Sequence, residues 1–106
     1  MKDVINRGGI KINPTDIENI LQAHPSIVLA AIVPFPDDVL GERIRLFVTL
    51  SPDAGFTFDE MTAYLAENGV AKIRWPELLE IIDEMPLTPT LKIQKGELVK
   101  KLTRQP

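Results

Sequence analysis

The sequence predicts a small α/β (α+β) domain in which helices pack on a three-stranded sheet and a β-hairpin comes first. Segments with apolar residues at helical spacing alternate with apolar runs of strand length, and turns rich in proline and glycine separate them. This alternation favours layers of helix and sheet around one core. A chain of 106 residues forms about one domain, with little room for a deep cleft of its own.

The N-terminal part predicts a hairpin followed by a helix. Two short apolar runs flank Gly8-Gly9, and glycine tolerates the positive φ that a tight turn requires. Asn13 before Pro14 is typical of a helix start, because asparagine caps free N–H groups and proline fits the first turn. We expect this helix to end near His24, whose position at the negative end of the helix dipole explains it better than catalysis does.

Three strands are expected to form the sheet. Residues 27–33 are apolar on both faces, as in a central strand that is covered on both sides. The proline-rich residues 34–38 are expected to end this strand. Residues 43–50 alternate between apolar and mixed positions, and residues 78–82 form a third short apolar run.

The second helix has the clearest start in the sequence. Thr57 and Glu60 form the Thr-x-x-Glu pattern of a capping box, which is worth about 1 kcal/mol. Phe56 is placed to pack against Met61, and Gly69 supplies the C-terminal stop. We interpret the apolar stripe of this helix as core.

The C-terminal loop is restrained by Pro86 and Pro89, which leave Lys92 at a fixed exit. A lysine on such a loop can be directed at an anionic partner with less loss of freedom than one on a mobile tail. The simpler interpretation is a solvated cation ahead of a last amphipathic helix over residues 94–102. The loop alone leaves both interpretations open.

Composition argues against several classes of protein. The formal net charge of -3 argues against a general nucleic-acid binder, and no apolar run approaches the length of a membrane span. The N-terminus lacks the pattern of a secretory signal, and the sequence has no cysteine for disulfides or thiolate metal sites. These features fit a cytoplasmic protein.

No complete catalytic machinery is visible in the sequence. We find no Gly-x-x-x-x-Gly-Lys phosphate loop, no metal-ligand cluster and no plausible Ser/His/Asp set. A lysine without a second catalytic group suggests half of an active site, with the other half on another domain.

Several short motifs occur in an order that resembles one family, the C-terminal domain of the adenylate-forming enzymes (the ANL superfamily). That family comprises acyl- and aryl-CoA ligases, nonribosomal adenylation domains and firefly-type luciferases. Motifs spaced over nearly the whole chain are stronger evidence than any one of them. They are Lys2 to Ile5, Gly8-Gly9, Lys11 to Pro14, Ile17-Glu18, Pro36-Asp37, Gly41-Glu42, Asp83, Met85-Pro86, and Pro86-x-Thr88-x-Thr90-x-Lys92 with Lys95.

The resemblance implies a single C-terminal lid domain over residues 1–106, with a hinge and hairpin at 2–13 and a sheet-helix body at 14–103. Lys92 matches the catalytic lysine that binds the acid carboxylate and the α-phosphate, and Lys2 matches the hinge. The partner would be an N-terminal adenylation domain that binds ATP and the carboxylic acid. ATP, Mg²⁺ and CoA would be used by the full-length enzyme, and none of them would be bound by this domain alone.

The resemblance also implies a second task, thioester formation after the lid has rotated. Gly8 and Gly9 match the loop that lines the pantetheine tunnel, and Lys11 lies beside it. Lys72 and Arg74 match a segment near the CoA nucleotide in some aryl-CoA ligases. No residue matches a metal ligand.

Three residues depart from the family pattern. Leu91 stands where the family usually has a glycine before the catalytic lysine, which puts in question how the loop enters the cleft. Ile10 stands where related ligases often have glutamate. Ile73 replaces a common aromatic residue, which weakens any inference of adenine stacking there.

The motif from Lys11 to Pro14 resembles the acyl- and aryl-CoA ligase version, so we expect the lid of an AMP-forming acyl-CoA synthetase of fatty acid metabolism, and a fragment of a longer chain. Alone it is expected to have no ligase activity. Three alternatives stay open: a stand-alone α/β binding or regulatory module, the lid of an adenylating enzyme that does not use CoA, and an interaction domain unrelated to ATP. The sequence does not indicate which acid is activated or the oligomeric state.

Overall fold

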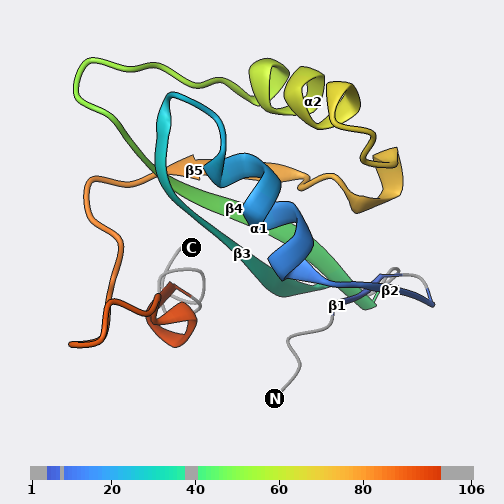
Figure 1. Ribbon diagram of the computed structural model, residues 1–106. Coiled ribbons are helices and arrows are strands. Elements are labelled where there is room, and N and C mark those ends of the chain that lie inside the picture. The colour runs from blue at the N-terminus through green and yellow to red at the C-terminus, as the bar shows by residue number, and fades with distance from the viewer. Residues whose placement is uncertain (1–4, 8, 38–40, 99–106) are drawn as a thin grey trace.

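The computed structural model describes residues 5–7, 9–37 and 41–98, and its helices pack on a single mixed sheet (Figure 1). The expected α+β class is confirmed, with an N-terminal hairpin and a body of strand and helix. Lys2 and Gly8 lie outside the described residues. The elements in order are β1 (Ile5–Arg7), β2 (Ile10–Ile12), α1 (Pro14–Gln22), β3 (Ile27–Asp37), β4 (Gly41–Leu50), α2 (Phe58–Glu67), the 3-10 helix η1 (Lys72–Arg74) and β5 (Leu78–Ile81).

Strand β4 is the centre of the sheet. It pairs antiparallel with β3 from Ile27↔Leu50 to Asp37↔Gly41 and parallel with β5. The hairpin joins the same sheet because β1 pairs antiparallel with β4 at Arg7↔Gly41. The hairpin and the three body strands therefore form one continuous surface.

Strand β3 differs from the expectation in two ways. It ends the strand order instead of lying in its centre, and it runs through Pro34 and Pro36 to Asp37 instead of ending at residue 33. Proline is tolerated in an edge strand when its missing N–H would point away from the partner strand. Both prolines stand at positions of this kind, because they continue the alternation of Ala30 and Ile32, whose N–H groups also point away from β4.

Helix α1 covers that free edge of β3. The Glu18 carboxylate accepts the Ile32 N–H at 2.6 Å, and the Gln22 side-chain oxygen accepts the Ala30 N–H at 3.4 Å. Two N–H groups of the edge are therefore satisfied by side chains of α1, and prolines remove the next two donors.

Two apolar clusters lie on opposite faces of the sheet, because successive side chains of a strand alternate between faces. Ala30 and Ile32 belong to the larger cluster, which α1, α2 and the hairpin complete. Ala31 and Val33 belong to a smaller cluster, which the C-terminal segment completes. The run 27–33 is thus covered on both faces, as expected.

Local capping follows the sequence closely. Asn13 Oδ1 accepts the Thr15 N–H at 3.0 Å, and Thr57 Oγ1 accepts the Glu60 N–H at 3.1 Å. Helix α2 stops before Gly69, whose φ is +76°. The expected last helix begins at Lys95, and its part beyond residue 98 lies outside the described residues. None of the helices in the described part of the chain is long and apolar enough to cross a membrane.

Candidate functional site

The C-terminal loop is a narrow hairpin with Lys92 at one side of its turn. The Gln94 N–H donates to the Pro86 carbonyl at 2.8 Å, and the Thr88 N–H donates to the Lys92 carbonyl at 2.8 Å. A β-bridge between Leu87 and Ile93 lies between these two bonds. The loop is therefore a small ladder, which the two prolines in the sequence did not reveal.

Thr88 holds the backbone of Lys92 on both sides. Besides the bond to the Lys92 carbonyl, its Oγ1 accepts the Lys92 N–H at 3.0 Å and lies 3.0 Å from Thr90 Oγ1. In the sequence, Thr88 is recognisable only as part of the motif that ends at Lys92. Its function here is to fix the main chain from which the lysine side chain starts.

The turn itself contains a leucine in an unusual conformation. The Leu91 N–H donates to the Thr88 carbonyl at 2.8 Å, which closes a tight turn, and Leu91 has a φ of +65°. Hairpin loops often place a left-handed residue directly after such a turn, and glycine is favoured there. A residue with a Cβ pays about 1–2 kcal/mol for this conformation. The geometry explains why a glycine suits the position before Lys92.

The base of this hairpin is packed onto the sheet. Leu87 and Ile93 contact the smaller apolar cluster, where Phe47, Met85 and Leu98 are buried. The hairpin is therefore anchored through its sides, while its turn extends outward.

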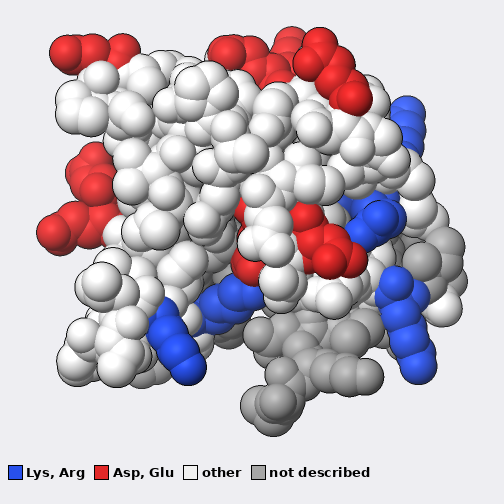
Figure 2. Space-filling view, in the orientation of Figure 1, with Lys and Arg blue, Asp and Glu red and all other residues white. Residues whose placement is uncertain are grey.

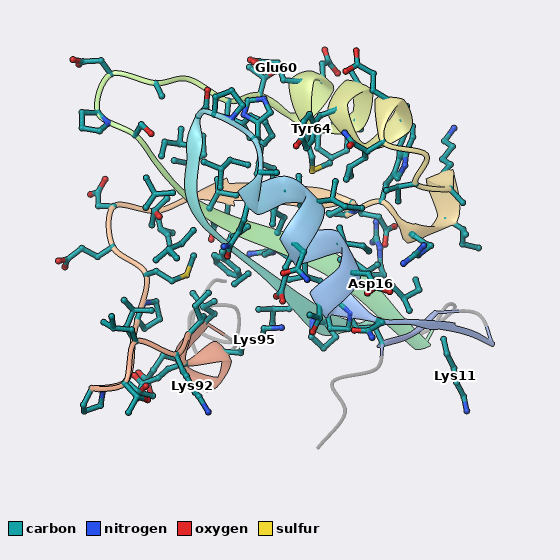
Figure 3. The ribbon with its side chains drawn as sticks, viewed as in Figure 1. Lys11, Asp16, Glu60, Tyr64, Lys92 and Lys95 are labelled. Atoms are coloured by element: carbon teal, nitrogen blue, oxygen red, sulfur yellow. The ribbon has the colours of Figure 1, made fainter. Side chains whose placement is uncertain are left out.

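Lys95 and Lys92 have different surroundings. Lys95 Nζ lies 2.7 Å from Glu18 Oε2, the oxygen that also accepts the Ile32 N–H. Lys92 is exposed and forms no ion pair with any residue in the described part of the chain. The two lysines lie near one another in the view of Figure 3, and the Lys92 side chain extends away from the body. Lys95 is thus a structural cation, and Lys92 is available to an outside anion.

The glycine hairpin lies at the other side of the domain. Lys11 is exposed and labelled far from Lys92 in Figure 3. Gly9 has a φ of +87°, and a Cβ added there would meet nothing within 4 Å. The residue pairs between β1 and β2 end at Arg7↔Ile10, so Gly9 belongs to the turn that joins the two strands. Gly9 therefore faces open space.

The two candidate CoA contacts on η1, Lys72 and Arg74, have different surroundings. Arg74 lies 3.6 Å from Asp16 of α1, measured from Nη2 to Oδ2. Lys72 is exposed and lines an open pocket of about 290 Å³. Ile73 between them is 44% exposed. The other residues that line this pocket are Phe58, Thr62, Trp75, Pro76 and Glu77.

Charge is unevenly distributed over the surface. On the face shown in Figure 2, acidic side chains gather over α2, and Lys and Arg side chains lie below and to the right of them. Asp59 and Glu60 in the first turn of α2 contribute to the acidic side. The regions that carry Lys11 and Lys92 are the ones that favour an anionic partner.

His24 has a structural role. Its ring makes edge contacts with Phe56 and Tyr64 at centroid distances of 4.9 and 4.8 Å. Its Nδ1 accepts the Ser26 N–H at 3.1 Å, so that nitrogen carries no proton in this arrangement. His24 is therefore held by ring contacts and a backbone hydrogen bond, and the interaction with the helix dipole stays a prediction.

Comparison with solved structures defines the class of domain. The fold matches Mycobacterium smegmatis MbtA with a TM-score of 0.87 and 37% identity, covering 94% of this chain and 19% of that one. It matches an acyl-CoA synthetase of Brucella canis with a TM-score of 0.82 and 30% identity, covering 97% of this chain and 20% of that one. The class is therefore a small α+β domain that forms one part of much larger proteins.

Curated relatives give the same result. The chain is 38% identical over 105 residues to the medium-chain fatty-acid–CoA ligase of Escherichia coli, covering 98% of this chain and 19% of the relative. It is 39% identical over 97 residues to the 2,3-dihydroxybenzoate-AMP ligase of Bacillus subtilis, covering 92% of this chain and 18% of the relative. The chain thus spans about a fifth of the length of these relatives.

The family model described as the AMP-binding enzyme C-terminal domain matches residues 16–92, well over half of the chain. This chain belongs to that family, the C-terminal domain of the adenylate-forming ligases.

Proposed function

We propose that this domain is the mobile lid of an ATP-dependent acyl-CoA synthetase and that Lys92 is its catalytic residue for acyl-adenylate formation. The observation that carries the proposal is the contrast between a fixed main chain and a free side chain at Lys92. Thr88 binds the lysine backbone through both its N–H and its carbonyl, while the side chain is exposed. Because its main chain is already fixed, this cation can enter a neighbouring domain with less loss of freedom than a lysine on a mobile tail.

The chemistry requires such a cation. An anionic carboxylate attacks the anionic α-phosphate of ATP, and negative charge builds up on the oxygens between them. A lysine ammonium placed there stabilises that charge more in the transition state than in the ground state. A positioned donor of this kind is worth about 3–4 kcal/mol, or two to three decades in rate.

For thioester formation, we propose that the lid rotates about Lys2 and presents the glycine hairpin. Gly8 and Gly9 would line the path of the pantetheine arm, where the open space beside Gly9 admits a thin substrate. Lys11 would contact a CoA phosphate from the same hairpin. The lid would comprise residues 14–103, with the hinge and hairpin at 2–13.

Of the two candidate CoA contacts on η1, Lys72 is the stronger. It lines the pocket beside Trp75 and is exposed, whereas Arg74 is engaged with Asp16. We therefore assign CoA phosphate binding mainly to Lys72. Arg74 would have to leave Asp16 before it could contact a CoA phosphate.

The Mg²⁺ that accompanies ATP is assigned to the partner domain. Within the ranges that the structure describes, no group of three or more His, Asp or Glu side chains could hold a metal ion. No step of the proposed lid function uses a metal ion held by the described residues.

A lid that serves an adenylating enzyme without CoA is the second candidate. It is favoured by the 39% identity to the 2,3-dihydroxybenzoate-AMP ligase, whose name specifies an adenylate product. The two candidates share Lys92 and differ in whether the glycine hairpin meets CoA.

The test uses a chimera of this chain and the Escherichia coli relative, the medium-chain fatty-acid–CoA ligase. In the chimera, this chain replaces the matching segment of the relative and is joined to the rest of that enzyme. Acid-dependent exchange of pyrophosphate into ATP measures adenylate formation. We expect no exchange by this chain alone, exchange by the chimera, and loss of exchange in Lys92→Ala. Lys11→Ala is the matched control and should exchange normally. Full exchange by Lys92→Ala, or none by a folded unmutated chimera, would contradict the proposal.

The thioester step separates the two candidates. The chimera is supplied with preformed acyl-adenylate and CoA, and thioester is measured directly. A fall in this rate in Lys11→Ala or Lys72→Ala supports the acyl-CoA synthetase. Absence of thioester formation by an unmutated chimera that still exchanges pyrophosphate would support the second candidate.

A further inference from the structure

Leu91 is the most exposed large apolar residue described in the chain and also has a backbone conformation that leucine rarely adopts. It is 77% exposed, and its φ is +65°. Within the described residues, Asp53 is the other residue besides glycine with a positive φ, and aspartate enters that region readily. A bulky residue there is an outlier, and such outliers cluster at functional sites.

Nothing in the described part of the domain offsets this conformational cost. Leu91 belongs to neither apolar cluster, although Leu87 and Ile93 of the same hairpin do pack inward. The turn is closed by the Leu91 N–H, and glycine could donate the same hydrogen bond. The side chain therefore has no packing function among the residues that the structure describes.

We propose that the Leu91 side chain is a contact residue that packs against an apolar wall of the adenylating domain when Lys92 enters its cleft. This inference rests on the proposed function of Lys92. The two side chains leave adjacent residues of one fixed turn, so they approach the same partner together. The contact would hold the lid in the adenylation position.

The length of the side chains favours a protein wall over the acid itself. Lysine must extend several bonds beyond the reach of leucine to place its ammonium beside the carboxylate. When Lys92 reaches the reacting atoms, Leu91 lies nearer to the mouth of the cleft, where the partner is protein. Burial of a leucine side chain there would favour the closed state by about tenfold or more.

The test compares stability with activity in Leu91→Gly. Glycine removes the strained Cβ, so the melting temperature of this chain should be unchanged or a few degrees higher. In the chimera, pyrophosphate exchange should fall about tenfold, while thioester formation from preformed acyl-adenylate should be unchanged. Leu91→Met should retain most of the exchange. Val28→Ser, which alters an exposed apolar residue on β3, should leave both rates unchanged.

Each other outcome overturns the inference in a distinct way. Unchanged exchange in Leu91→Gly with loss of exchange in Lys92→Ala would reject the Leu91 contact alone. Normal exchange in both variants would reject the proposed function as well. A loss that grows with the hydrocarbon length of the acid would show that Leu91 meets the substrate instead of the wall. Equal losses in both half-reactions, or a lower melting temperature, would assign Leu91 a structural role.

Discussion

The domain presents two hairpins that carry a lysine beside a turn of positive φ, and they differ in almost every other respect. The glycine hairpin buries Ile5 and Ile12 in the larger cluster and extends the sheet. The hairpin of Lys92 packs Leu87 and Ile93 into the smaller cluster on the other face. One turn is open and without a side chain, whereas the other projects a leucine.

Under the proposed function, this difference would allow one small domain to serve two half-reactions. A bare turn leaves space through which a thin substrate can pass, and a turn fixed by threonine directs a single cation. The two hairpins lie well apart, with Lys92 at the lower left and Lys11 at the lower right of Figure 3, so each could be presented to a cleft separately. Substitutions in each hairpin test whether each one serves a different half-reaction.

The largest expected effect is that of Lys92→Ala on adenylate formation. Loss of the positioned ammonium should lower pyrophosphate exchange by two to three decades, about 3–4 kcal/mol. Lys92→Arg should recover only part of it, because a planar guanidinium differs in shape from an ammonium. The rate of thioester formation from preformed acyl-adenylate should change much less. An equal fall in that rate would contradict separate roles for the two hairpins.

Gly9→Leu should have the opposite selectivity. A leucine at a φ of +87° would be strained and would occupy the open space beside the turn. We expect thioester formation to fall by about tenfold or more, with exchange within about twofold of the parent. Asp53→Leu, which places a leucine at another positive φ in the turn after β4, controls for loss of stability alone. Equal losses in both half-reactions would contradict the tunnel role.

Glu18→Ala should destabilise the support on which the Lys92 hairpin rests. It would leave the Ile32 N–H without its acceptor and Lys95 without its partner, at a cost of about 2–4 kcal/mol. Chemical denaturation of this chain measures the loss. Lys95→Ala should cost less, since the carboxylate would still accept the N–H group. A change in the free energy of unfolding below about 0.5 kcal/mol in Glu18→Ala would show that the contacts of Glu18 with Ile32 and Lys95 do not stabilise the domain.

Removal of the Arg74 ion pair should have the smallest effect. Arg74 and Asp16 are 3.6 Å apart and partly exposed, so Asp16→Asn should lower the free energy of unfolding by less than about 1 kcal/mol. If Arg74 can also serve CoA, its release in Asp16→Asn should lower the apparent Kd for CoA in the chimera. Lys72→Ala should raise that Kd several-fold. An unchanged Kd in both variants would remove η1 from the proposed CoA contacts.

Features set by neighbouring residues could be predicted from the sequence. The caps at Asn13 and Thr57 and the stop at Gly69 each depend on side chains within a few positions, and each lies where the sequence placed it. The family resemblance likewise depended on short motifs in order, and it is confirmed.

Features set by distant residues could not be predicted. Strand β3 continues through Pro34 and Pro36 because its partner lies on one side only, which local proline statistics do not reveal. The ion pair of Lys95 joins residues far apart in the chain. Leu91 could be recognised as a departure from the family, but its exposure and φ emerge only from the folded turn. The roles of Lys92 and the hairpin residues stay predictions.

The covered edge of β3 has a further consequence for a domain that moves through solvent. An open strand edge can pair with a strand of another molecule, and such pairing leads to aggregation or exchange of segments. Glu18 and Gln22 occupy the donors that a foreign strand would need, and the two prolines supply none. For the proposed lid, this protected edge would prevent such pairing while the domain moves from one docking position to the next.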